Sequence, residues 1–168
     1  MISTANDGNN KIWINDNVFN NNEIRDFLDL YCINKKPFPF TWYSKQYYNE
    51  KFRRLNDFFK ECNLNFNFEG IELWTQYNSK TDRHQDKDEY KLFKYNELHF
   101  PIFSTVIFLN VENDHEGFLM FDSGISIRPK VNRVVLFTPG TFHEVSNFLS
   151  NRVTLLINFW SYRIKGAV

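Results

Sequence analysis

The chain has 168 residues, and its 20 Lys and Arg balance its 20 Asp and Glu, so the formal net charge is zero. This length suits one domain, and an aromatic content of 18%, which includes 19 Phe, excludes a disordered chain because disordered chains lack aromatic side chains. The balanced charge argues against a protein that holds a nucleic-acid backbone, and no apolar run is long enough to cross a membrane.

Residues 1–10 are polar and rich in Asn, and the sequence predicts a flexible N-terminal tail for them. They contain no apolar segment typical of a secretory signal, so we expect a cytoplasmic protein. We expect residues 11–168 to form a single domain, which begins with a short strand at 11–14.

Two helices are predicted before residue 70, because apolar side chains recur there at the spacing of one helical face. The first follows Asn20–Asn22, which suit a helix N-cap, and its apolar face comprises Ile24, Phe27, Leu28 and Tyr31. The second extends roughly over 49–62, and its apolar face comprises Phe52, Leu55, Phe59 and Cys62. Each face needs an apolar surface, so we expect both helices to pack on one outer face of a sheet.

The rest of the chain is typical of successive short strands separated by turn residues such as Pro139-Gly140. The predicted strands are 71–77, 104–109, 117–121, 125–128, 133–138, 143–146 and 152–162. Many short strands at close spacing favour an all-β barrel or sandwich. The segment 87–103 is too long for a hairpin, and we expect a surface loop with some helix there.

Three side chains are candidates for a metal site. On an extended segment His84 and Asp86 point to the same side, so both can reach one ion. His143 can supply a third ligand if its strand lies beside that segment. Two His and one carboxylate leave coordination positions open, which suits non-haem Fe(II) that must bind a co-substrate and oxygen. The alternative is a solvated charged loop around His84 and a structural role for His143.

Arg152 interrupts an otherwise apolar strand, and Thr154 shares its face. Burying a guanidinium costs free energy unless an anion meets it, and a carboxylate matches its forked geometry. That anion is either a small dicarboxylate, to which Thr154 would add a hydroxyl donor, or a protein carboxylate such as Glu72 or Glu144. The sequence leaves these two alternatives open.

Taken together, His84-x-Asp86, His143 and Arg152-x-Thr154 resemble the Fe(II)/2-oxoglutarate-dependent dioxygenase superfamily, in its prolyl-hydroxylase-like branch. The resemblance covers about residues 11–163 and includes the segments 11–19, 74–77, 104–110, 116–119 and 131–137. It implies a mainly β protein, with a double-stranded β-helix, the jelly-roll barrel that cupins share, and two N-terminal helices packed on one face.

The resemblance implies that His84, Asp86 and His143 ligate Fe(II), and that Arg152, supported by Thr154, binds 2-oxoglutarate. Tyr77 is expected to be a further donor to this co-substrate. The implied hydroxylase consumes O2, decarboxylates 2-oxoglutarate and hydroxylates a substrate, with ascorbate as an assay additive. We expect the substrate to be a prolyl residue in a peptide or protein, or otherwise a free amino acid or small metabolite. No nucleic-acid or membrane partner is expected.

The chain departs from the family pattern at several positions. Many members have Trp where Asn158 stands here, and Trp160 follows it; strand alternation allows both to face the cavity. The segment 87–103 matches no family pattern and is expected to form part of a substrate lid. Two alternatives stay open: a cupin-type metalloprotein without 2-oxoglutarate, since 139–147 resembles the second cupin motif, and a non-catalytic binding module. The oligomeric state does not follow from the sequence.

Overall fold

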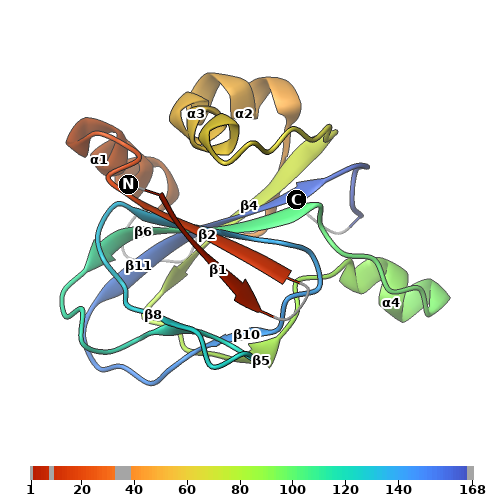
Figure 1. Cartoon of the computed structure of the whole chain (residues 1–168). Coiled ribbons are helices and arrows are strands. Elements are labelled where there is room, and N and C mark those ends of the chain that lie inside the picture. The colour runs from red at the N-terminus through yellow and green to blue at the C-terminus, as the bar shows by residue number, and fades with distance from the viewer. Residues whose placement is uncertain (1, 8–9, 33–38, 166–168) are drawn as a thin grey trace.

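Two antiparallel sheets form the framework of the computed structural model, which describes residues 2–7, 10–32 and 39–165 (Figure 1). The seven-stranded sheet has the order β1-β2-β9-β6-β11-β4-β3. Its strands are β1 (Ile2–Asp7), β2 (Asn10–Asp16), β3 (Thr41–Ser44), β4 (Gly70–Tyr77), β6 (Phe103–Val111), β9 (Arg133–Phe137) and β11 (Arg152–Trp160). The four-stranded sheet has the order β5-β10-β7-β8 and comprises β5 (Thr81–His84), β7 (Leu119–Phe121), β8 (Ser126–Ile127) and β10 (His143–Val145).

Strand β11 lies between β4 and β6, and all nine of its residues are buried. Because side chains alternate along a strand, the two faces of β11 belong to two different cores. Toward the helices it presents Val153, Leu155, Ile157 and Phe159. Toward the smaller sheet it presents Arg152, Thr154, Leu156 and Asn158, of which Leu156 belongs to the core between the two sheets. Strand β11, which the sequence predicted as an apolar strand with one arginine, therefore contributes to both the core beneath the helices and the core between the two sheets.

Three helices cover the outer face of the larger sheet: α1 (Asn21–Tyr31), α2 (Lys45–Lys51) and α3 (Arg53–Glu61) (Figure 1). The first predicted helix is confirmed, and the side chain and backbone of Asn20 form a capping box with Glu23. A fourth helix, α4 (Glu89–Tyr95), lies apart from the others within the segment predicted as loop with some helix (Figure 1). None of the described helices is long and apolar enough to cross a lipid bilayer.

The prediction of two N-terminal helices was wrong in one respect, because the second predicted helix is divided into α2 and α3. The division falls at Phe52, which has φ −119° and ψ 35° and leaves the helical conformation. Its ring is fully buried and stacks on Phe27 and Tyr48 at centroid distances of 5.2 and 5.6 Å. The helical spacing of apolar residues continues through this break, so periodicity alone did not reveal it.

The prediction of a flexible tail over residues 1–10 was also wrong for the part of it that the structure describes. Residues 2–7 form β1, an edge strand paired with β2 from Ile2 opposite Asn15 to Asp7 opposite Asn10. Only Ile2 and Ala5 contact the apolar cores. Backbone hydrogen bonds to β2 hold this strand, so it carries no hydrophobic alternation that the sequence could reveal.

A buried asparagine connects the start of α1 to the turn before β9. The Phe19 N–H donates to Asn132 Oδ1 at 2.9 Å, and Asn132 Nδ2 donates to the Phe19 carbonyl. Asn132 also has a left-handed backbone, with φ +64°. We expect Asn132→Ala to lower the free energy of unfolding by about 2–4 kcal/mol in urea denaturation, since it unpairs both backbone groups and strains the turn.

The exposed Asn63, with φ +55°, provides the control for that measurement. Asn63→Ala carries the left-handed backbone penalty without the buried hydrogen bonds, so it should lower the free energy of unfolding by only about 1 kcal/mol. Equal losses in the two variants would show that the Asn132 amide contributes nothing to the attachment of α1.

Candidate functional site

Three potential metal ligands meet at one end of the space between the two sheets. His84 ends β5 and His143 begins β10, and the antiparallel register places these two residues directly opposite each other. Their ring centroids are 4.3 Å apart, and His84 Nε2 lies 3.7 Å from Asp86 Oδ1. One ligand atom from each of His84, Asp86 and His143 lies within 4.8 Å of the other two. Three side chains from separate segments thus converge on one point.

Backbone carbonyl groups orient both imidazole rings. The Nδ1 atom of His84 lies 2.8 Å from the Asp82 carbonyl oxygen, and that of His143 lies 3.0 Å from the Thr141 carbonyl oxygen. Because a carbonyl oxygen only accepts, each Nδ1 must carry the proton and donate it, which leaves a lone pair on each Nε2. Hydrogen bonds from the other ring nitrogen to a backbone carbonyl are how proteins fix metal-binding histidines. The donor set and its orientation therefore fit a divalent transition metal.

His143 is buried among apolar side chains. Only 3% of its surface is exposed, and the Phe137 ring lies 4.7 Å from the imidazole, centroid to centroid. Burial lowers the pKa of His143; the Asp86 carboxylate opposes this effect, and His84 adds to the lowering. The neutral imidazole, which is the form that binds a metal, is thus favoured.

Arg152 lies in the same interior, where no carboxylate of the described residues pairs with it. Only 4% of its surface is exposed, its Nη1 donates to the Gly117 carbonyl at 3.1 Å, and its Nε has no hydrogen-bond partner. Among the described residues no carboxylate forms an ion pair with it, and burial alone lowers its pKa to about 10. The protein carboxylates Glu72 and Glu144 therefore do not neutralise this cation, and the remaining alternative is an anion from outside the chain.

The surroundings of Arg152 hold the guanidinium in place. Its carbon Cζ lies 5.1 and 5.4 Å from the ring centroids of Phe108 and Phe148. Gly117 has φ +67°, and a Cβ atom there would lie 3.2 Å from the Phe148 ring and 3.4 Å from Arg152 Nη1. A glycine is therefore favoured both by the backbone conformation and by the limited space beside the guanidinium.

The turn that leads into β11 is fixed by Glu116. Its carboxylate accepts hydrogen bonds from the backbone N–H groups of Leu149 and Ser150 at 3.1 and 2.8 Å. Asn78 Oδ1 accepts a further bond from the Arg152 N–H at 2.7 Å. Hydrogen bonds to Glu116 and to Asn78 thus fix the backbone at the point where β11 begins with Arg152.

Two cavities meet at the candidate ligands. The inner cavity has a volume of only about 10 Å³ and is lined by Gln76, Thr81, His84, Val106, Leu119, His143, Val145, Arg152 and Leu156. The outer cavity has a volume of about 450 Å³, and its walls include Phe40, Glu72, Trp74, Asp86, Lys87, Tyr90, Asn158 and Lys165. Gln76, Thr81 and His84 line both. The metal-ligand cluster therefore lies where the inner cavity, which Arg152 lines, meets the larger outer cavity.

The structure places the other predicted residues on different faces. Thr154 is buried opposite Gln76 and Phe108, on the face that carries Arg152. Tyr77 lies opposite Val153 and contacts the core beneath the helices, and its hydroxyl donates to Asn151 Oδ1 at 3.4 Å. The structure therefore does not bring Tyr77 to the cavity, in contrast to its predicted role.

Sequence reasoning missed Gln76, which lines both cavities and donates from Nε2 to Thr81 Oγ1 at 3.1 Å. Its position one residue before Tyr77 places it on the inward face, which strand alternation counted from Trp74 would have shown. Of the two residues considered at the far end of β11, Asn158 lines the outer cavity, whereas Trp160 is fully buried and is not among its lining residues.

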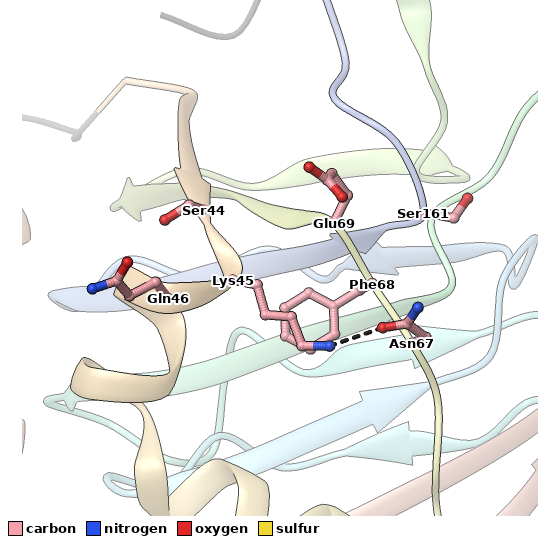
Figure 2. Close-up of a pocket in the computed structure, with 7 residues that line it drawn as sticks. All are labelled: Ser44, Lys45, Gln46, Asn67, Phe68, Glu69 and Ser161. Carbon is pink, nitrogen blue, oxygen red and sulfur yellow. Dashed lines mark hydrogen bonds between the residues drawn. The ribbon is translucent and has the colours of Figure 1, made fainter.

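Figure 2 shows a different cavity, on the helix side of the larger sheet, lined by Ser44, Lys45, Gln46, Asn67, Phe68, Glu69 and Ser161. Its cation is already satisfied, because Lys45 Nζ donates to Asn67 Oδ1 at 2.8 Å and lies 5.0 Å from the Phe68 ring centroid (Figure 2). The lining contains no imidazole or thiol, so this cavity offers no metal ligands beyond one carboxylate.

Comparison with solved structures assigns the chain the fold of the 2-oxoglutarate- and Fe(II)-dependent oxygenases, a jelly-roll fold, with prolyl hydroxylases among the similar proteins. No protein-family model and no curated protein matches the sequence. The likeness is therefore carried by the three-dimensional arrangement of the strands.

The individual structures agree over nearly the whole chain. A prolyl-4-hydroxylase from Pseudomonas putida has a TM-score of 0.62 at 16% identity, covering 90% of this chain and 93% of that one. The viral collagen prolyl hydroxylase of Paramecium bursaria Chlorella virus-1, in complex with 2-oxoglutarate, has a TM-score of 0.60 at 14% identity, covering 90% and 96%. HygX from Streptomyces hygroscopicus, with nickel and 2-oxoglutarate bound, has a TM-score of 0.58 at 13% identity, covering 93% and 89%.

Proposed function

We propose that this protein is an Fe(II)- and 2-oxoglutarate-dependent hydroxylase, an oxidoreductase that couples the oxidative decarboxylation of 2-oxoglutarate to hydroxylation of a substrate. We propose that residues 11–168 make up this one domain. One observation carries the proposal: the cavity lined by His84 and His143 of the ligand cluster is also lined by a buried arginine that forms no ion pair with any carboxylate of the described residues.

In this proposal His84, Asp86 and His143 hold the metal through two imidazole nitrogens and one carboxylate oxygen. Bound Fe(II) supplies the chemistry that activates O2, which amino-acid side chains cannot perform. The chain's own contribution is orientation and exclusion of water. The carbonyls of Asp82 and Thr141 fix the two rings, and the buried Phe137 ring covers one side of His143.

Arg152 gives the inner cavity its preference for a dicarboxylate. A buried guanidinium is stable only when an anion meets it, and the free donor on Nε is directed at no protein acceptor. The distal carboxylate of 2-oxoglutarate satisfies this need, with Thr154 on the same face as an additional hydroxyl donor. Gln76 replaces Tyr77 as the further polar group at this cavity, because it is the neighbour that faces inward.

The outer cavity is the proposed substrate site, since its lining includes His84 and Asp86 but not Arg152, which lines the inner cavity. The prolyl-hydroxylase-like branch suggests a prolyl residue in a peptide or protein as the first candidate substrate. A free amino acid or another small metabolite is the second. Lys87, Asp88 and α4 supply part of the cavity wall, in agreement with a substrate-facing role for segment 87–103.

The proposed function predicts that 2-oxoglutarate binds only when a metal is present. Adding 2-oxoglutarate to protein loaded with Mn(II) should raise the melting temperature, because a ligand that binds only the native state stabilises it. 2-Oxobutyrate, which lacks the distal carboxylate, should give a much smaller shift. With Fe(II), O2 and ascorbate, slow succinate release should occur even without added substrate.

Two outcomes would contradict the proposal and would identify the alternatives. If Mn(II) binds but 2-oxoglutarate and 2-oxobutyrate have equal effects, the protein is a cupin-type metalloprotein that does not use this co-substrate. If both Mn(II) and 2-oxoglutarate bind but no succinate forms with any substrate, the protein is a binding module on the oxygenase fold.

A further inference from the structure

The outer cavity contains a pair of hydrogen-bond acceptors that the protein leaves incompletely satisfied. Asn158 and Glu72 are direct neighbours on β11 and β4, and both line this cavity. Only 3% of the Asn158 surface is exposed, and its Oδ1 has no hydrogen-bond partner. Its Nδ2 donates to Glu72 Oε2 at the long distance of 3.5 Å. A buried acceptor without a protein donor is satisfied by a bound water or by a ligand, and at the wall of a cavity a ligand can take that place.

Glu72 is a partly buried carboxylate that forms no ion pair with any lysine or arginine of the described residues. Burial raises its pKa to about 7, and Asp86 and Asp88 contribute to the rise, whereas the donors of Asn158 and Trp160 oppose it. Asp88, by contrast, accepts from the Lys91 N–H and from the Tyr162 hydroxyl, both at 2.9 Å. Glu72 is therefore the acidic group of this cavity whose charge the protein does not compensate.

The basic residues of the cavity wall interact with other groups. Lys87 Nζ lies 3.5 Å from Glu89 Oε1, and Lys165 Nζ lies 5.6 Å from the Tyr90 ring centroid. Neither of these contacts involves Glu72. The described lysine and arginine side chains therefore supply no cation to the ionised Glu72 carboxylate, and a ligand that carries one can meet it there.

Aromatic side chains stand beside this pair. Trp74 shares the inward face of β4 with Glu72, and the rings of Phe40 and Trp74 have centroids 4.7 Å apart. Trp74 is 7% exposed, whereas Phe40 is 52% exposed and lies at the outer part of the cavity. Aromatic faces next to a carboxylate are a favourable environment for an ammonium group and the carbon atoms attached to it.

We propose that the outer cavity binds a small substrate through a protonated amine, which donates to the Glu72 carboxylate and to Asn158 Oδ1 while its carbon skeleton packs on Trp74 and Phe40. The inference rests on the proposed function and narrows its substrate class. It favours a free amino acid or an amine metabolite over a prolyl residue within a peptide, because the nitrogen of a peptidyl proline carries neither a proton nor a charge.

The test compares free and blocked amines on the protein loaded with Mn(II) and 2-oxoglutarate. The probes are L-proline, L-lysine and spermidine, each beside the form in which every amino group is acetylated, and the blocked peptide acetyl-Gly-Pro-Gly-amide. Affinity is measured by calorimetry and by the shift in melting temperature. We expect at least one free amine to bind about tenfold to 100-fold more tightly than its acetylated form, the scale of a hydrogen bond to a charged group.

Variants then assign the effect to this pair. Glu72→Gln and Asn158→Leu should each weaken binding of that amine by about tenfold or more. Glu69→Gln makes the same chemical change at an exposed carboxylate just before β4, outside this cavity, and should leave amine affinity unaltered. The comparison of free with acetylated probes uses the unaltered chain, so it holds even if a variant fails to fold.

The inference is overturned if the acetylated probes or the blocked peptide bind as well as the free amines, if Glu72→Gln binds amines normally, or if no free amine binds. Binding of Mn(II) and of 2-oxoglutarate is measured first, in the unaltered chain and in each variant. Failure at that stage in the unaltered chain contradicts the proposed function itself. Normal loading without amine binding contradicts only the amine assignment.

Discussion

His143→Ala is expected to reduce Mn(II) affinity by at least about 100-fold and to abolish 2-oxoglutarate turnover with Fe(II). The expectation follows from the donor set: three protein ligands hold the proposed metal, and His143 is the most buried of them. Its loss leaves His84 and Asp86, both partly exposed, where water competes for the metal. Titration of the variant with Mn(II), followed by calorimetry, measures the effect.

Exposed histidines provide the control for this variant. His115 lies outside the cluster and contacts Asp114 and Arg128, so His115→Ala should retain full Mn(II) affinity. His143→Gln keeps most of the side-chain volume, which separates loss of the ligand from loss of packing around Phe137. Loss of metal binding in the His115 variant, or retention of it in both His143 variants, would refute the ligand assignment.

Arg152→Met is expected to weaken 2-oxoglutarate binding by roughly 30-fold to several thousand-fold, which corresponds to about 2–5 kcal/mol for removing one partner of a buried charge pair. Mn(II) affinity should stay unchanged, because the guanidinium is not a metal ligand. Binding of 2-oxobutyrate should also be nearly unchanged, since this probe has no distal carboxylate for Arg152 to meet. Calorimetry on the Mn(II)-loaded protein measures all three affinities.

Two further measurements sharpen this result. Tyr77→Phe should leave 2-oxoglutarate affinity unaltered, because the Tyr77 side chain lies on the helix-covered face. Arg152→Met should leave the free energy of unfolding of the ligand-free protein nearly unchanged, because removing an unpaired buried charge offsets the loss of its bond to the Gly117 carbonyl. An equal loss of Mn(II) and 2-oxoglutarate affinity in the Arg152 variant would contradict its assignment to the co-substrate.

The sequence predicted the central strands well, and the reason is burial. β4, β6, β9 and β11 are packed on both faces or alternate clearly between two cores, so their composition is that of strands. β1, β3 and β5 were not predicted as strands, because they are partly exposed and are paired with a neighbour through backbone hydrogen bonds. Backbone hydrogen bonds of this kind do not require a particular pattern of apolar side chains, so the sequence pattern does not reveal them.

The candidate site was predicted in part for a similar reason. The spacing of His84 and Asp86 identified two side chains that the structure brings together with His143, and Arg152 was conspicuous as a charge within an apolar strand. The pairing of Glu72 with Asn158 depends on which strands are neighbours in the sheet, and the sequence does not contain that register in readable form.

The two faces of β11 have a consequence for how this chain can change over time. Substitutions at 153, 155, 157 and 159 change the packing beneath the helices and therefore the stability of the folded protein. Substitutions at 152 and 158 alter the two cavities that these residues line, and neither residue belongs to the core beneath the helices. Within the nine residues of β11, alternate positions are therefore selected for folding and for the chemistry of the cavities. New specificities can arise at the second set without loss of the fold.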